Sequence, residues 1–177
     1  RFKFSSEDID YLSNLEMFEQ GFLEYLKNFS FRGQLDAIAE GSFVFPNTPV
    51  IRVKASIIEA QLIEGILLNC INFQSLIASK AIRYYQASQG DPILEFGLRR
   101  AQGIDGALSA SRAAYVGGCA ATSNVLAGKV LGIPVSGTMA HSWVMLHPSE
   151  KEAFDAYKSL FPEEVSKVKE SFTGKFL

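Results

Sequence analysis

The segment 133–145 combines several side chains that could do chemistry within a short stretch. The chain has two histidines and one tryptophan, and His141 and Trp143 both lie here. The pattern predicts a short apolar strand, a turn near Thr138, and a helix that starts around His141. Histidine can act as a base, an acid or a nucleophile near neutral pH, and the hydroxyls of Thr138 and Ser142 could bind beside it. The alternative is that His141 only caps a helix or packs.

Two adjacent arginines, Arg99 and Arg100, follow a predicted strand over 93–96 and lie between glycines. Guanidinium groups match the oxygens of carboxylates and phosphates, and glycine lets the backbone approach an anion closely. We therefore expect an anion site at this strand end. The alternative is a surface arginine pair bonded to Glu95 or Asp105.

A third polar group, Thr122, Ser123 and Asn124, lies at the start of another predicted helix. Such residues cap a helix or hydrogen-bond a ligand at its positive end, and capping is favoured for any one of them. The glycines and Lys129 that surround them do not form a Walker loop, because Val130 stands where Ser or Thr is required. The chain also contains no Gly-x-Ser-x-Gly elbow and no histidine–carboxylate spacing typical of zinc, which disfavours serine and zinc hydrolases.

The composition indicates a folded protein. The chain has 177 residues, of which 47% are hydrophobic and 20% charged, and its net charge is −2. These values suit one domain, or one and a half small ones, and argue against a dedicated nucleic-acid surface. No apolar run approaches the ~20 residues of a membrane span, and the longest candidate is taken to end at Leu68. Cys70 and Cys119 are expected to be buried thiols in a reducing compartment.

The start of the chain carries no signal-peptide pattern, and a cytoplasmic location is expected by default. Because the first residue is Arg1 and not Met, we expect the chain to begin inside a longer gene product or to have lost its beginning.

The hydrophobic periodicity places the candidate residues on alternating strands and helices. Helices are expected over 5–15 and 18–29, short strands over 35–39, 42–45 and 50–54, and a long helix over 56–89 with a break at 69–72. Further on, strands at 93–96 and 135–136 alternate with helices at 105–116, 123–131 and 149–161. This alternation predicts parallel βα units, as in a barrel or a wound sheet. A boundary is predicted near Gly90, which divides the chain into 1–90, 91–162 and a helical tail over 163–177.

Four motifs in this order resemble the nicotinate phosphoribosyltransferase family. They are EFGLRRAQG at 95–103, DGALSAS at 105–111, TSNVLAGK at 122–129 and GTMAHSWV at 137–144. The stretch 40–53 is similar to the part of the family that links its N-terminal domain to its barrel. The resemblance covers residues 5 to 162. It implies an α/β fold of the type II phosphoribosyltransferases, with an N-terminal α+β domain followed by the first part of an irregular α/β barrel.

The resemblance also implies an activity. The family converts nicotinate and phosphoribosyl pyrophosphate into nicotinate mononucleotide in NAD salvage, requires Mg²⁺, and uses ATP as co-substrate through a phosphorylated histidine. By motif match that histidine is His141. Thr138 matches a nicotinate contact, and Arg99 and Arg100 match arginines that approach anionic substrate groups. The expected partners are therefore the substrates, and a homodimer is expected. Neither nucleic acid nor a membrane is expected as a partner.

Three further residues complete the expected site. Ser123 and Asn124 form a neutral edge that tolerates the nicotinate carboxylate better than an aspartate would, which favours the acid over the amide as substrate. Ser142 could steady His141 or Thr138. We expect no metal ligands among these residues.

The chain also departs from the family pattern. Family members are much longer, and their barrel continues after the histidine segment with another substrate-binding arginine, whereas the likeness here fades after Pro162. Two alternatives therefore stay open. One is a non-catalytic fragment or interaction domain of such an enzyme. The other is a quinolinate- or nicotinamide-type phosphoribosyltransferase.

Overall fold

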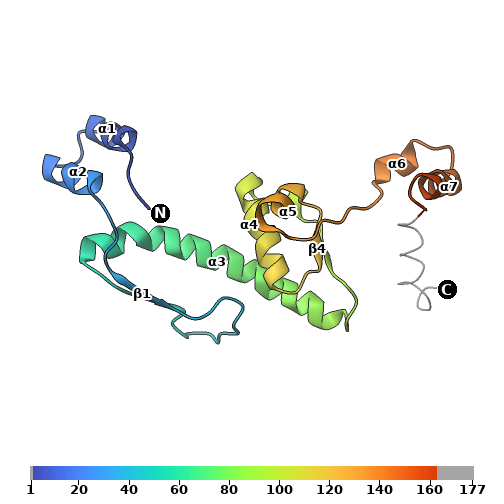
Figure 1. Cartoon of the computed structure of the whole chain (residues 1–177), viewed down its shortest axis with the longest axis horizontal. Coiled ribbons are helices and arrows are strands. Elements are labelled where there is room, and N and C mark those ends of the chain that lie inside the picture. Colours follow the sequence, from blue (N-terminus) through green and yellow to red (C-terminus); the bar gives the residue numbers. More distant parts are fainter. Residues whose placement is uncertain (1, 163–177) are drawn as a thin grey trace.

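The computed structural model describes residues 2–162, which are arranged along one long helix, α3 (Ile57–Ala87) (Figure 1). A capping box starts α3: the Ser56 side chain accepts a hydrogen bond from the backbone N–H of Glu59, and the Glu59 carboxylate bonds back to the backbone N–H of Ser56. The break predicted at 69–72 is wrong, since α3 runs without interruption for 31 residues. Asn69 and Asn72 are single polar residues among good helix formers, with no proline to interrupt the hydrogen bonds.

The N-terminal part packs two short helices on the start of α3. Helices α1 (Ser6–Asn14) and α2 (Gln20–Lys27) match the predicted pair with shorter ends. Leu23 and Leu26 of α2, and Phe29 just after it, are buried. Phe29 also lies in an edge-to-face aromatic cluster, whose other members are Phe2, Phe4 and Tyr25. The backbone N–H of Arg32 donates to the Glu59 carboxylate, which ties the chain after α2 to the start of α3.

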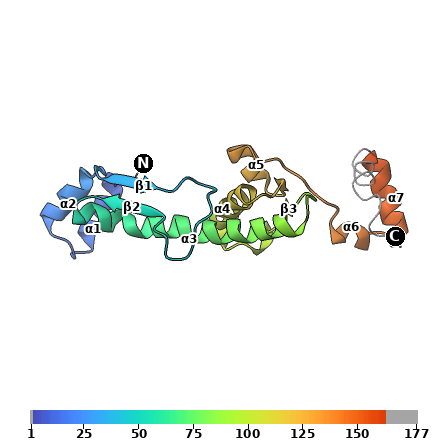
Figure 2. The ribbon, with the colours of Figure 1, turned by 90° about the horizontal axis from the view of Figure 1, so that it is seen from below.

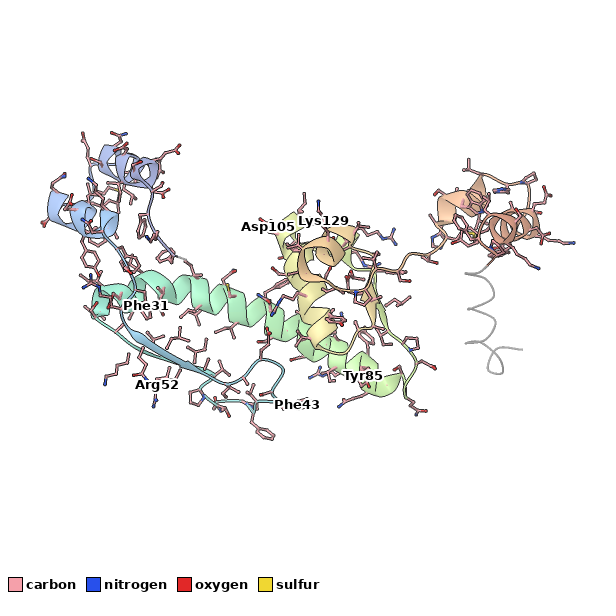
Figure 3. All side chains as sticks on the ribbon, in the orientation of Figure 1. Phe31, Phe43, Arg52, Tyr85, Asp105 and Lys129 are labelled. Atoms are coloured by element: carbon pink, nitrogen blue, oxygen red, sulfur yellow. The ribbon has the colours of Figure 1, made fainter. Side chains whose placement is uncertain are left out.

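Strands β1 (Gln34–Ala37) and β2 (Ile51–Lys54) form an antiparallel hairpin alongside α3 (Figure 2). The additional strand predicted at 42–45 is wrong, because these residues belong to the loop that joins β1 to β2. The aromatic side chains of Phe43 and Phe45 are each 80% exposed there, and Figure 3 shows Phe43 projecting from the loop. Pro46 and Pro49 lie beside this stretch and cannot donate to a strand ladder, which explains why it has no strand partner.

The second half forms short parallel βα units. They consist of β3 (Leu94–Glu95), the 3₁₀ turn η1 (Leu98–Arg100), α4 (Gly103–Val116), β4 (Ala121–Thr122) and α5 (Val125–Leu131). β3 pairs with β4 in parallel, and Thr122 bridges in parallel to Val135 on its other side. The parallel arrangement predicted from the alternating pattern is therefore confirmed. Within residues 2–162 the two sheets are small, and they do not close into a barrel.

Helices α3 and α4 pack closely through small residues. A Cβ placed on Gly117 would lie 2.6 Å from the Ala78 carbonyl oxygen, so the two backbones approach too closely for a side chain there. Ala81, Ala114 and Cys119 form the buried cluster at this contact. Tyr85, near the end of α3, lies over Gly118 (Figure 3). This packing fixes the βα units against the C-terminal half of α3.

Two further helices, α6 (His141–Met145) and α7 (Glu150–Leu160), lie beyond the βα units (Figure 1). They are held together by the Trp143 indole N–H, which donates a 3.0 Å hydrogen bond to the Ala153 carbonyl oxygen. His147 is half-buried, and its Nδ1 atom lies 2.8 Å from the Trp143 carbonyl oxygen. The helices predicted near His141 and over 149–161 are confirmed.

Of the helices in the described residues, α3 alone is long and apolar enough, by length and composition, to cross a membrane. The sequence predicted that this apolar stretch ends at Leu68, and it therefore underestimated the length of the stretch. A single helix of this kind is weak evidence for a membrane span.

Candidate anion-binding site

The Arg99–Arg100 pair lies on the turn η1, directly after β3. The turn is closed by the backbone N–H of Arg100, which donates to the Gly97 carbonyl oxygen at 2.9 Å. Both arginine side chains are exposed, and neither forms an ion pair within residues 2–162. The alternative of a surface pair bonded to Glu95 or Asp105 is therefore wrong. The turn instead presents two unpaired guanidinium groups side by side in sequence.

Glu95 lies under this turn and accepts hydrogen bonds from three directions. Its Oε1 atom accepts from the backbone N–H of Gly97, at the start of the turn. Its Oε2 atom accepts from the Thr122 hydroxyl at 2.6 Å and lies 3.0 Å from the Ser111 hydroxyl. Thr122 and Ser111 are almost completely buried. The carboxylate thus joins β3, α4 and β4 beneath the arginines.

Asn124 belongs to the same network and caps α5. Its side-chain oxygen accepts a 3.3 Å hydrogen bond from the backbone N–H of Ala127, and its amide nitrogen donates to the Ser111 hydroxyl. The capping interpretation is therefore confirmed for Asn124, which is 4% exposed. Its neighbour Ser123 is half-buried, and the Ser123 hydroxyl forms no hydrogen bond in the part of the chain that the structure describes. Of the two predicted ligand contacts, Ser123 has the freer polar group.

A small apolar pocket adjoins the arginine turn. It has a volume of about 240 Å³ and lies between η1 and the first turns of α4 and α5. Its walls are mostly aliphatic, with Asn124 as the one polar residue; they include Leu98, Ile104, Ala107 and Leu126. This volume is below that of most small-molecule sites. The pocket could hold one small ring beside Leu98, the first residue of the arginine turn.

The structure places the histidine segment apart from the arginine turn. His141 is the first residue of α6 and is exposed, as are Thr138 and Ser142. Among residues 2–162 the side chains of these three residues form no hydrogen bond. Figure 1 shows α6 beyond α5, at the end of an extended connection. The structure therefore brings Ser123 and Asn124 to the arginine turn but does not bring Thr138, His141 and Ser142 there. His141 does begin a helix, and it neither caps nor packs.

The two cysteines lie in different environments. Cys119 is buried, as expected, and its pKa is raised by burial and by the nearby charge of Glu95. Cys70 is exposed, which corrects the expectation that both thiols are buried. It faces a groove of about 740 Å³ between α3 and the β1–β2 loop. The Glu40–Arg112 ion pair joins that loop to α4.

No metal centre is evident in the described residues, since within them no three His, Cys, Asp or Glu side chains gather closely enough to hold an ion. Magnesium would therefore need most of its ligands from phosphate oxygens, water or other groups.

The sequence interpretation missed the roles of Glu95, Ser111 and Thr122. Glu95 was considered only as a partner for the arginines, and Ser111 only as one of the small residues of a helix. The available signal was the parallel pairing itself: it places the ends of β3 and β4 side by side, so Glu95 and Thr122 become neighbours.

Three comparisons with known proteins agree with this architecture. Residues 1–72 match the model of the nicotinate phosphoribosyltransferase N-terminal domain. A nicotinate phosphoribosyltransferase of Mycobacterium tuberculosis is 46% identical over 161 residues, which cover 91% of this chain and 35% of that protein. One from Caenorhabditis elegans is 48% identical over 155 residues, which cover 85% of this chain and 28% of that protein.

The crystal structure of human nicotinic acid phosphoribosyltransferase superposes with a TM-score of 0.74 at 38% identity. The match covers 82% of this chain and 30% of the human chain. The chain thus spans about a third of the length of the relatives that it matches. The fold described above, mixed helices with small sheets, is the fold of this region.

Proposed function

Because this chain is related to the N-terminal region of the nicotinate phosphoribosyltransferases, we propose that it supplies part of a site that makes nicotinate mononucleotide. The substrates are nicotinate and phosphoribosyl pyrophosphate, and ATP hydrolysis drives the reaction in NAD salvage. The proposal covers activity, substrates and partners of the whole protein, of which the chain matches about a third.

The observation that carries this proposal is the pair of arginines on η1, neither of which forms an ion pair in the part of the chain that the structure describes. Both reactants are anions: one carries a carboxylate, the other a phosphate and a diphosphate. Exposed guanidinium groups on a short turn can bind such oxygens through charged hydrogen bonds. The adjoining apolar pocket of about 240 Å³ suits a pyridine ring better than a polar ligand. Ser123, next to the pocket residue Asn124, has a hydroxyl that forms no hydrogen bond within the described residues.

Departure of diphosphate leaves an electron-poor ribose carbon, so this reaction depends mainly on positioning and on charge stabilisation. Arg99 and Arg100 would bind the departing diphosphate or the nicotinate carboxylate. Magnesium, when bound with the diphosphate, would neutralise part of its charge. Thr138 is the proposed nicotinate contact, and Ser142 would steady the histidine segment.

His141 is the proposed site of phosphorylation. An imidazole nitrogen attacks the γ-phosphorus of ATP, the bond to the bridging oxygen breaks, ADP leaves, and the imidazole proton passes to solvent. His141 is exposed and forms no hydrogen bond or ion pair within residues 2–162, which leaves the ring accessible for this step. Because α6 stands apart from η1, the proposal requires α6 to approach the arginine turn in the complete site.

A second candidate function is a non-catalytic interaction domain. Much apolar surface favours it: large side chains on α3, on the β1–β2 loop and on α6 are exposed, among them Ile57, Phe43, Phe45 and Met145. An exposed apolar surface of this kind is normally covered by another part of the protein or by a partner. Here the rest of the barrel, or a second subunit of the proposed homodimer, would cover it.

The test is formation of nicotinate mononucleotide from nicotinate, phosphoribosyl pyrophosphate and Mg-ATP. Product formation by the chain that is lost in His141→Ala supports the enzyme. A folded chain that makes no product supports the interaction domain. Quinolinate or nicotinamide offered in place of nicotinate, with and without ATP, separates the related phosphoribosyltransferases, since quinolinate conversion needs no ATP.

A further inference from the structure

Glu95 bonds to both sides of the candidate site. Its Oε1 atom holds the backbone N–H of Gly97, the residue whose carbonyl oxygen closes the arginine turn. Its backbone carbonyl oxygen accepts from the Ser123 N–H at 3.0 Å, at the start of α5. One residue therefore connects the turn that carries the arginines with the segment that carries the free serine hydroxyl.

Buried hydroxyl groups of α4 and β4 also hold the Glu95 carboxylate. Thr122 donates to Oε2 at 2.6 Å, and the Thr122 oxygen in turn accepts from the Asn124 N–H at 3.0 Å. Ser111 lies 3.0 Å from the same Oε2 atom. Hydrogen bonds from Gly97 to Oε1, and from Thr122 and Ser111 to Oε2, fix the orientation of the carboxylate within the protein. They use most of the acceptor positions of the carboxylate.

The space around the carboxylate is equally restricted. A Cβ on Gly97 would lie 2.8 Å from Glu95 Oε1. Gly97 has φ of −87°, which any residue can adopt, so only the closeness of Glu95 opposes a side chain there. A side chain at position 97 would therefore displace the Glu95 carboxylate from its position beside the turn.

We propose that Glu95 is a positioning residue, which holds the Arg99–Arg100 turn in register with the start of α5. It does so through the Gly97 N–H and the Thr122 hydroxyl and does not itself touch the substrate. The part of this inference that concerns substrate affinity rests on the proposed function. The part that concerns the order of the turn does not.

Limited trypsin digestion of the 177-residue chain tests the order of the turn, because trypsin cleaves after Arg99 and Arg100 themselves. Cleavage after Lys80 and Arg83, within α3, reports general unfolding. We expect Glu95→Ala to speed cleavage after Arg99 and Arg100 about tenfold relative to the α3 sites, since a charged hydrogen bond to the turn is lost. Glu40→Ala, which removes the exposed carboxylate of the Glu40–Arg112 ion pair to α4, should leave the ratio unchanged.

Two more variants separate positioning from other roles. In Glu95→Gln the amide oxygen can still accept from Gly97, and the amide nitrogen can donate to the Thr122 oxygen, so the ratio should return close to the wild-type value. Gly97→Ala leaves Glu95 in place but displaces its carboxylate, and it should resemble Glu95→Ala. An equal increase at all sites, or no increase in either alanine variant, would overturn the proposal.

Calorimetric titration with pyrophosphate measures whether Glu95 affects anion binding at the arginine turn. We expect about tenfold weaker binding by Glu95→Ala and near-normal binding by Glu95→Gln. Equal loss in both variants would contradict positioning, because the glutamine amide keeps the bonds to Gly97 and Thr122 that the positioning role requires. If the wild-type chain binds no pyrophosphate, the proposed function fails, and the digestion ratios still decide whether Glu95 orders the turn.

Discussion

The Thr122 hydroxyl donates a 2.6 Å hydrogen bond to the carboxylate of Glu95, which lies 27 residues earlier in the chain. Parallel pairing of β3 with β4 places the two residues opposite each other at the strand ends. Thr122 has no exposed surface. The bond therefore joins the two βα units at the point where their loops must meet to form a site.

Replacing Thr122 with valine tests this relationship, because valine has nearly the same shape but no hydroxyl. The Glu95 carboxylate loses a buried donor, and the Asn124 N–H loses its acceptor. We expect the free energy of unfolding in urea to fall by about 2–3 kcal/mol. Thr138→Val is the matched control: Thr138 is exposed, so its change should stay within about 0.5 kcal/mol. Equal effects would contradict the network.

The contact between α3 and α4 predicts opposite outcomes for two glycines of the second half. Gly117→Ala would place a methyl group 2.6 Å from the Ala78 carbonyl oxygen, and we expect it to destabilise the chain by about 1–3 kcal/mol. Gly106, within α4, has nothing within 4 Å of its Cβ position. Gly106→Ala should stabilise by up to about 1 kcal/mol, because alanine favours the helix. Thermal unfolding of both variants measures the difference. A stabilised Gly117→Ala would contradict the close approach.

The two thiols should react at very different rates. Cys70 is exposed, whereas Cys119 is buried and its pKa is raised by burial and by Glu95. With a disulfide reagent at neutral pH we expect one fast equivalent from Cys70 and a slow one from Cys119, because only the thiolate attacks. Cys70→Ser should abolish the fast phase. A fast phase that persists in this variant would show that Cys119 is accessible.

The Glu40–Arg112 ion pair predicts a small dependence of stability on pH. Arg112 holds the pKa of Glu40 below its ordinary value of 4.5. A lowered pKa in the folded chain means that the pair stabilises it above this value, and that the contribution is lost as pH falls through the lowered pKa. Both side chains are partly exposed, so the contribution should be below about 1 kcal/mol and should shrink with salt.

Urea unfolding of the wild type and of Glu40→Gln at pH 7 and pH 3 measures that dependence. The difference between the two proteins should be smaller at pH 3 than at pH 7, because Glu40 becomes more protonated as pH falls toward its lowered pKa. A difference that grows at low pH would have the wrong sign for this ion pair.

Local patterns predicted most helices well, since caps and apolar periodicity act within a few residues. Ser5 and Ser149 cap α1 and α7 as such residues do. The errors occurred where distant contacts decide. The stretch 42–45 contains strand-forming Phe and Val residues but has no partner strand, and Cys70 is exposed although it follows an apolar run of α3.

In the candidate site, too, local features could be predicted and features that depend on distant contacts could not. The arginine turn and the Asn124 cap could be predicted because each depends on a few adjacent residues. The Glu95–Thr122 bond could not, because it requires the register of two strands separated by α4. The separation of His141 from η1 was equally hidden, since no local pattern determines where the connection after Val135 leads.

The most direct test of the proposed function is calorimetric titration of the chain with phosphoribosyl pyrophosphate in the presence of Mg²⁺. We predict measurable binding by the wild type and about tenfold or greater weakening in Arg99→Ala and Arg100→Ala, since each removes a charged contact. Arg83→Ala, which removes an exposed arginine from α3, should bind like the wild type. No binding by the folded chain, or equal binding by all four proteins, would contradict the assignment of the arginine turn as the anion site.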